Sequence, residues 1–149
     1  MILVLGLGNV LLSDDGVGVH AATSFEGRED VRVRDGGTLG LSLLPEIETS
    51  AGLIAVDAMA LGEEPGAVRV FEGDDMDAQL RGRKTSVHEL ALADLIEAAA
   101  LVGCKPERRA LVGIQPHSLE WGLAPTPDVQ AAIGRAHEAI DELVSRWRQ

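Results

Sequence analysis

The chain has little cysteine and no long apolar run. Its single cysteine, Cys104, cannot form an intramolecular disulfide. No apolar stretch approaches the roughly 20 residues that a membrane-spanning helix needs. The first apolar run, residues 1–5, has neither the basic segment nor the cleavage site of a secretory signal. We therefore expect a cytoplasmic protein that does not insert into a membrane.

Basic charge is also scarce. The sequence has 13 basic and 24 acidic residues, for a formal net charge of −11, and the acidic residues are spread along the chain. Such a surface repels phosphate backbones and anionic lipids, so we expect no nucleic-acid partner. A length of 149 residues with 46% hydrophobic content predicts one globular domain over residues 1–149.

Apolar runs alternate with stretches of helical period along the first half of the chain. They predict strands at about 1–6, 30–34 and 53–57, and helices at about 15–26 and 39–50. Strands such as ILVL and LIAV are apolar throughout, as in strands buried on both faces of a parallel sheet. This half of the chain therefore predicts a parallel β-α-β-α-β unit.

The second half predicts an edge strand, a loop, two helices and a last central strand. Residues 66–73 follow their turn too closely for a crossover helix and predict an antiparallel edge strand. The remaining predictions are a strand over 109–115, a turn-rich loop over 116–127 and a helix from 128 to about 148. We therefore expect an α/β fold with three αβα layers, similar to hydrolase folds, and a mainly parallel five-stranded sheet with one antiparallel strand.

The segment at 73–85 has no clean period and mixes acidic with basic residues, so we interpret it as an exposed loop. Loops of this length are often functional, which makes it our candidate for partner choice. Ser86 follows as a helix N-cap, with Glu89 three residues later, and predicts a helix to about Val102.

The first strand ends in the turn GLGNVLLSDDGVGVH, which does not match a dinucleotide fingerprint because Leu11 stands where the third glycine belongs. Its glycines instead predict a tight turn with close backbone approach. The acidic pair in this turn divides into two roles. We interpret Asp14 as a cap of the following helix, which would stabilise the fold by about 1 kcal/mol, and Asp15 as a functional carboxylate at the sheet edge.

Three further polar residues lie at the ends of predicted elements. Asp57 ends an apolar strand, where a carboxylate is desolvated unless it is paired or serves a ligand. His88 lies in the first turn of its helix, where the dipole favours a neutral imidazole that can bind a metal. With Asp15, these residues form either a metal site or a hydrolytic site. Asp35 either lies in an ordinary glycine turn or forms a wall of the same cleft and assists catalysis.

Five sequence blocks in order resemble one family, the maturation endopeptidases of NiFe-hydrogenases. The blocks are GLGNVLLSDDGVGV, DGGTLG, VDAM, SVHEL, and GIQP followed by LEWGLAPTPDV. Members of this family remove the C-terminal extension of a hydrogenase large subunit after its nickel has been inserted. The resemblance spans nearly the whole chain and implies an enzyme, an aspartic-type or nickel-dependent peptidase. It also implies the large-subunit precursor as partner, and we expect the protease to be a monomer.

The resemblance also implies roles for individual residues. It assigns Asp15, Asp57 and His88 to recognition of a nickel ion that the substrate carries, so that the free protein binds nickel weakly or not at all. Relatives carry Glu or Asp at the position of Asp15. The resemblance implicates Asp35 in activity. The residues themselves allow three ways to activate the attacking water, namely Asp57 as a base, Asp35 as a base, or the metal itself.

Two other functions compete with this interpretation. One is a nickel-binding chaperone without peptidase activity that uses the same three ligands. The other is a peptidyl-tRNA hydrolase, whose chains also begin with a GLGN-type turn. That family continues with proline where this chain has Val10, and a net charge of −11 opposes an RNA substrate.

Overall fold

A computed structural model describes residues 1–36, 40–82 and 87–148 of the chain, and within the helix that starts at residue 87 the side chains of 87–90 are not described. Among the described residues, no helix is both long enough and apolar enough to cross a membrane.

The described elements alternate between strands and helices along most of the chain. Their order is β1 (Ile2–Gly6), the 3-10 helix η1 (Ser13–Gly16), α1 (Val17–Thr23), β2 (Val31–Asp35), the 3-10 helix η2 (Gly40–Leu43), α2 (Leu44–Glu48), β3 (Gly52–Ala58), β4 (Val68–Glu72), α3 (Asp74–Gly82), α4 (Val87–Leu101), β5 (Arg109–Ile114) and α5 (Pro127–Trp147). The helices predicted at 15–26 and 39–50 are shorter than expected, and each starts with a 3-10 turn. In the second of them, Pro45 lies at the start of α2.

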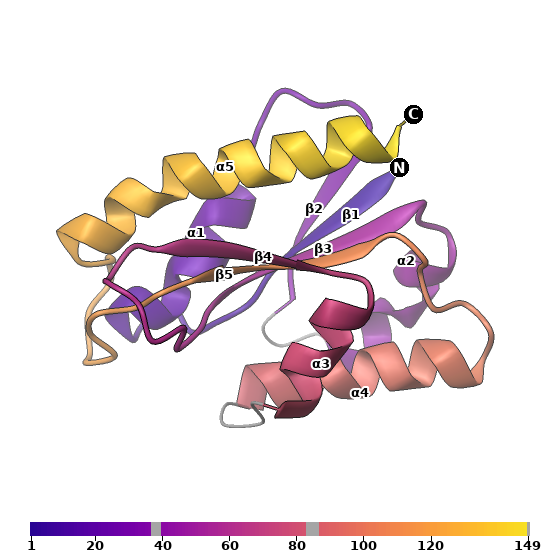
Figure 1. The fold of residues 1–149 in the computed structure, drawn as a ribbon, viewed down its shortest axis with the longest axis horizontal. Coiled ribbons are helices and arrows are strands. Elements are labelled where there is room, and N and C mark those ends of the chain that lie inside the picture. The colour runs from indigo at the N-terminus through magenta and orange to yellow at the C-terminus, as the bar shows by residue number, and fades with distance from the viewer. Residues whose placement is uncertain (37–39, 83–86, 149) are drawn as a thin grey trace.

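The five strands form one sheet in the order β2-β1-β3-β5-β4 (Figure 1). β1 pairs in parallel with β2 and β3, and β3 pairs in parallel with β5. β4 pairs antiparallel with β5 at the edge. The predicted α/β fold with a mainly parallel five-stranded sheet and one antiparallel strand is confirmed. Because β1, β2, β3 and β5 are parallel, their carboxyl ends share one edge of the sheet.

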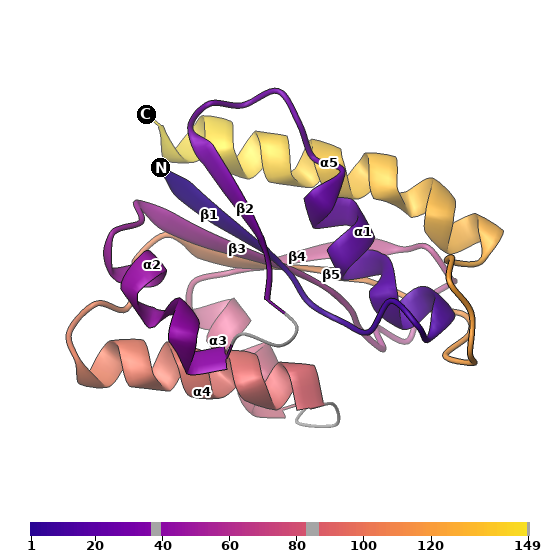
Figure 2. The same ribbon diagram turned by 180° about the vertical axis from the view of Figure 1, so that it is seen from behind.

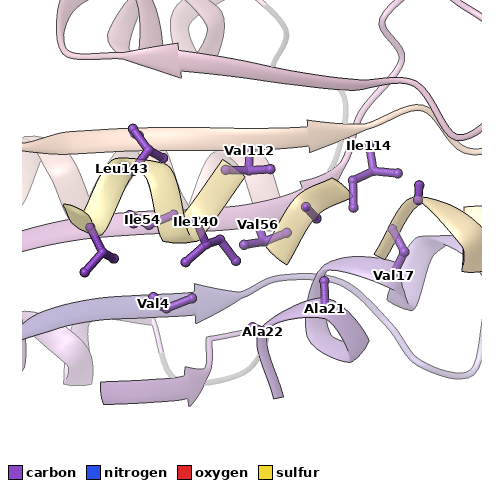
Figure 3. Packing of buried hydrophobic residues seen from close by; sticks show 14 of the residues in the cluster. Val4, Val17, Ala21, Ala22, Ile54, Val56, Val112, Ile114, Ile140 and Leu143 are labelled. Atoms are coloured by element: carbon purple, nitrogen blue, oxygen red, sulfur yellow. The ribbon is translucent and has the colours of Figure 1, made fainter. Parts of the chain in front are cut away.

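One face of the sheet is covered by α1 and α5 (Figures 1 and 2). Alternate residues of the central strands point to this face, and Figure 3 shows them packed against the helices. The labelled members of the cluster are Val4, Val17, Ala21, Ala22, Ile54, Val56, Val112, Ile114, Ile140 and Leu143. The apolar stripe of α5 is therefore a core-facing stripe, as its three-to-four-residue spacing predicts.

The opposite face is covered by α2, α3 and α4. The strand residues that alternate with those of the first face point to this side, among them Leu3, Leu53 and Ala55. With both faces covered, the central strands are buried throughout, which explains why their sequences are apolar without alternation.

The prediction of an irregular loop over 73–85 is wrong for most of that segment, because α3 occupies residues 74–82. Acidic residues occupy its first turn, where their negative charge interacts favourably with the positive end of the helix dipole. Met76 and Leu80, one turn apart, are buried against the α4 side of the sheet. Residues 83–85, with the predicted N-cap Ser86, lie outside the described residues.

A buried ion pair fixes α3 to β5. The carboxylate of Asp77 accepts hydrogen bonds from Nε and Nη2 of Arg109 at 3.0 and 2.7 Å, and from Nζ of Lys105 at 2.8 Å. The hydrogen bonds from Arg109 outweigh the effect of burial and lower the pKa of Asp77 from 3.8 to about 2. Asp77 therefore stays ionised inside the protein.

We expect the Asp77 ion pair to make the fold sensitive to acid. A carboxyl with a lowered pKa in the folded protein stabilises it above pH 3.8, and this contribution is lost as the pH falls toward about 2. In Asp77→Asn this titration is absent, so its deficit in unfolding free energy relative to the wild type should shrink by on the order of 2 kcal/mol between about pH 5 and about pH 2. Urea unfolding at several pH values measures the deficit. The control Asp75→Asn, which changes an exposed neighbour, should change the unfolding free energy at neutral pH by less than about 0.5 kcal/mol. A deficit for Asp77→Asn that does not change with pH would contradict the prediction.

Candidate active site

The turn after β1 is built for close backbone contact, as its glycines predict. Gly8 has φ +129°, and a side chain there would meet the carbonyl oxygen of Asp15 at 1.9 Å. A side chain at Gly18 would meet the carbonyl oxygen of Val56, on β3, at 2.2 Å. The glycines therefore bring the acidic pair 14–15 and the start of α1 against the end of β3.

Asp14 lies at the centre of this turn and is completely buried. Its carboxylate accepts hydrogen bonds from the backbone N–H groups of His117, Ser118 and Thr126 at 2.8, 2.9 and 2.6 Å. A fourth hydrogen bond comes from the Thr126 hydroxyl at 2.7 Å. Burial alone would raise the pKa of Asp14, but these hydrogen bonds outweigh it and lower the pKa below its ordinary value.

The interpretation of Asp14 as a helix cap is wrong. Neither η1 nor α1 has a side-chain cap hydrogen bond at its N-terminus. Asp14 instead binds the loop between β5 and α5, more than 100 residues away in sequence. As in a helix cap, the carboxylate accepts hydrogen bonds from backbone N–H groups. These donors belong to a segment far away in the sequence, so sequence spacing does not reveal them.

We expect Asp14→Ala to lower the free energy of unfolding by about 3 to 5 kcal/mol rather than the 1 kcal/mol of a lost cap, because four donors lose their partner in a buried site. Urea unfolding at neutral pH measures the loss. Asp94→Ala, an exposed aspartate on α4, is the matched control and should change stability by less than about 0.5 kcal/mol. A loss of about 1 kcal/mol for Asp14→Ala would favour a minor role for the loop contacts.

Asp15 follows Asp14 in the same turn and is half-buried. Its Oδ2 accepts a hydrogen bond from the backbone N–H of Asn9 at 2.9 Å, which ties the carboxylate across the turn. The 3-10 helix that contains Asp15 packs against β3. The structure thus places the backbone of Asp15 at the carboxyl edge of the sheet, next to the strand that carries Asp57.

Asp57 is the penultimate residue of β3 and is only 2% exposed. On this strand Leu53 and Ala55 point to the face that α2, α3 and α4 cover, so alternation directs Asp57 to the same face. The structure therefore places a buried carboxylate near the carboxyl end of a central strand, at the edge where open α/β sheets bind ligands.

His88 is the second residue of α4. α4 runs antiparallel to the parallel strands and begins on the side of the molecule where they end (Figures 1 and 2). The first turn of α4 therefore lies on the side where β3 ends, and α4 covers the face of the sheet toward which Asp57 points. The His88 side chain is outside the described ones, and among those that are described no group of three His, Cys, Asp or Glu residues could hold a metal ion.

Asp35 is the last residue of β2 and is exposed. Val31 and Val33 on this strand pack against the cluster under α1 and α5, so alternation directs Asp35 to that face. Asp35 and Asp57 thus end two strands that flank β1, at the same edge but toward opposite faces. Residues 37–39, which belong to the glycine turn after Asp35, lie outside the described residues.

Comparison with known proteins identifies the family of this chain. The family model described as "Hydrogenase maturation protease" matches residues 18–143. The chain belongs to this hydrogenase maturation protease family. It is 38% identical over 144 residues to the hydrogenase 2 maturation protease of Escherichia coli, a match that covers 93% of this chain and 87% of that protein. It is 38% identical over 151 residues to the hydrogenase expression/formation protein HupD of Rhizobium leguminosarum, covering 98% and 75% of the two chains.

Solved structures agree with this assignment. The hydrogenase maturating endopeptidase HybD from E. coli superposes with a TM-score of 0.85 at 35% identity, covering 93% of this chain and 88% of that one. A NiFe hydrogenase maturation protease from Thermococcus kodakarensis superposes with a TM-score of 0.83 at 26% identity, covering 95% and 97%. This maturation protease is accordingly a peptidase that cleaves the C-terminus of a hydrogenase large subunit. The two competing interpretations, a chaperone without peptidase activity and a peptidyl-tRNA hydrolase, are set aside.

Proposed function

We propose that this protease cleaves the C-terminal extension of the large subunit only after nickel has been inserted, and that it recognises the substrate-bound nickel through Asp15, Asp57 and His88. The observation that carries the proposal is the buried carboxylate of Asp57 at the carboxyl edge of a central strand. The 3-10 turn with Asp15 packs against that strand, and the helix that begins with Val87 and His88 starts at the same edge.

The chemistry of these residues suits a nickel ion that the substrate already holds. Two carboxylate groups and one imidazole provide oxygen and nitrogen donors without a thiolate, which is a modest ligand set for nickel. Such a site binds the free ion weakly but can complete the coordination of an ion held by other groups. Binding through the nickel would align the C-terminal tail of the substrate with the catalytic carboxylates.

Cleavage itself requires that a water molecule be activated next to the scissile bond. We assign this role to one of the two strand-end carboxylates, Asp57 or Asp35, which point toward opposite faces of the sheet, or to the nickel that the substrate carries. Asp35 is exposed and so can reach a bound peptide. Asp57 is buried, so the substrate would have to insert at the carboxyl edge of the sheet to reach it. We also propose that the protease acts in the cytoplasm.

In vitro processing tests this function. Purified protease is incubated with a nickel-loaded large-subunit precursor, and mass spectrometry follows the precursor. A single cut near the C-terminus that releases the extension supports the proposal. A precursor that stays intact with wild-type protease, or a set of cuts at many sites, would contradict it.

A further inference from the structure

Exposed apolar side chains gather on two segments at the carboxyl edge of the sheet, in the turn after β1 and in the loop between β5 and α5. Two of them are very exposed, Trp121 at 80% and Leu123 at 77%. We call the group the apolar rim, and its members are Val10, Leu11, Leu119, Trp121 and Leu123. Large exposed aromatic and aliphatic side chains that cluster in this way mark a site of protein interaction rather than ordinary surface.

The two segments of the apolar rim are joined by backbone hydrogen bonds. Leu12 and Gly122 form an isolated parallel bridge, in which the N–H of Gly122 donates to Leu11 O and the N–H of Ser13 donates to Gly122 O, both at 2.9 Å. A glycine suits this close approach, since a side chain at position 122 would meet Oγ of Ser13 at 2.5 Å. The buried carboxylate of Asp14 anchors the two ends of the same loop. The rim is thus preformed, so a partner that binds it does not first have to order it.

An acidic hollow lies where the two ends of the rim-bearing loop between β5 and α5 meet. It has a volume of about 530 Å³, and its lining includes His117 and Thr126, the loop residues that Asp14 holds, together with the carboxylates of Glu64 and Asp128. Both acidic residues are exposed. An apolar surface flanked by two carboxylates complements a partner surface in which apolar side chains are flanked by lysine or arginine.

We propose that the apolar rim and the acidic hollow form the docking surface for the folded body of the large-subunit precursor, separate from the edge that cleaves its tail. The rim is continuous with the cleavage edge, since Val10 and Leu11 lie in the turn that Asn9 and Asp15 close with their hydrogen bond. A precursor seated on the rim would bring its tail to that edge. This proposal rests on the proposed function, which makes a large folded protein the substrate.

The test compares two matched pairs of substitutions. Trp121→Ser with Leu123→Ser removes the most exposed part of the rim. Leu101→Ser with Val102→Ser, 88% and 64% exposed, removes comparable apolar surface at the far end of α4. Binding of the nickel-loaded precursor is measured by biolayer interferometry, separately from the kcat and KM of cleavage. Thermal unfolding verifies that both variants are folded.

We expect the rim pair to raise the Kd and KM for the precursor at least about tenfold, with kcat unchanged, because central interface residues carry most of the binding energy. The control pair should match the wild type. Glu64→Gln with Asp128→Asn should weaken binding mainly at low salt.

Three results would overturn the docking proposal. The first is a rim pair that binds the precursor as the wild type does, whether or not cleavage occurs. The second is an equal loss in the control pair. The third is a wild-type dimer that the rim substitutions convert to a monomer in light scattering, which would assign the rim to a second copy. Failure of the proposed function looks different, since the wild type would then bind the precursor without cleaving it.

Discussion

Asp57→Asn abolishes processing of the large-subunit precursor while the protein stays folded; this is the largest effect that we expect from a single substitution. Asparagine keeps the shape of the side chain in its buried position but loses the negative charge. Both roles assigned to Asp57, as a general base and as a ligand toward nickel, need that charge. Loss of a general base alone lowers the rate by about 10²-fold or more, which a time course of precursor cleavage by gel shift measures directly.

The controls for Asp57→Asn separate its role from general effects. Asp94→Asn, an exposed aspartate on α4, should process at the wild-type rate. Asp35→Asn tests whether catalysis depends on both strand-end carboxylates: a strong loss of kcat with precursor binding retained would support its catalytic role. If Asp57→Asn cleaved the precursor at the wild-type rate, the assignment of the active site to the end of β3 would be wrong.

The sheet could be predicted from the sequence because its signals are local. Apolar strands such as Ile2–Gly6 and Arg109–Ile114 are buried on both faces, and short connections leave few possible topologies. The edge strand Val68–Glu72 was predictable for the same reason, since its turn is too short for a crossover helix. Strand ends also located Asp35 and Asp57, because a parallel sheet brings such residues to one edge.

Features that depend on distant contacts were not predictable. The helix α3 buries only two apolar side chains, Met76 and Leu80, and it is held in addition by the ion pair of Asp77 with Arg109 on β5. Asp14 was misinterpreted because its four donors lie in the loop before α5, where sequence spacing gives no signal. The exposed Trp121 in that loop was the available hint, since a tryptophan in a turn-rich segment has no core to fill. Its neighbours in the apolar rim became visible only when the structure joined the two segments.

We expect the wild-type protease to process a nickel-loaded precursor at least about 10²-fold faster than the same precursor without nickel, as the proposed nickel checkpoint requires. A ligand set of two carboxylates and an imidazole has no thiolate and binds free nickel weakly, so the ion must be presented by the substrate. Coordination then positions the tail near the catalytic carboxylates, and positioning of this kind is worth orders of magnitude in rate. The measurement is the initial rate of release of the C-terminal extension from the two precursor forms.

His88→Ala provides the internal test of this nickel checkpoint. It should weaken capture of the nickel-loaded precursor but leave the weak binding of the nickel-free form unchanged, because the imidazole acts only toward the metal. His20→Ala, at a half-buried position on α1, is the matched control and should preserve the preference for nickel. Asp15→Asn should behave like His88→Ala, since both side chains are assigned to the same ion. Equal processing of nickel-free and nickel-loaded precursor by the wild type would contradict the checkpoint and leave Asp15, Asp57 and His88 as an acid–base set without a role in metal recognition.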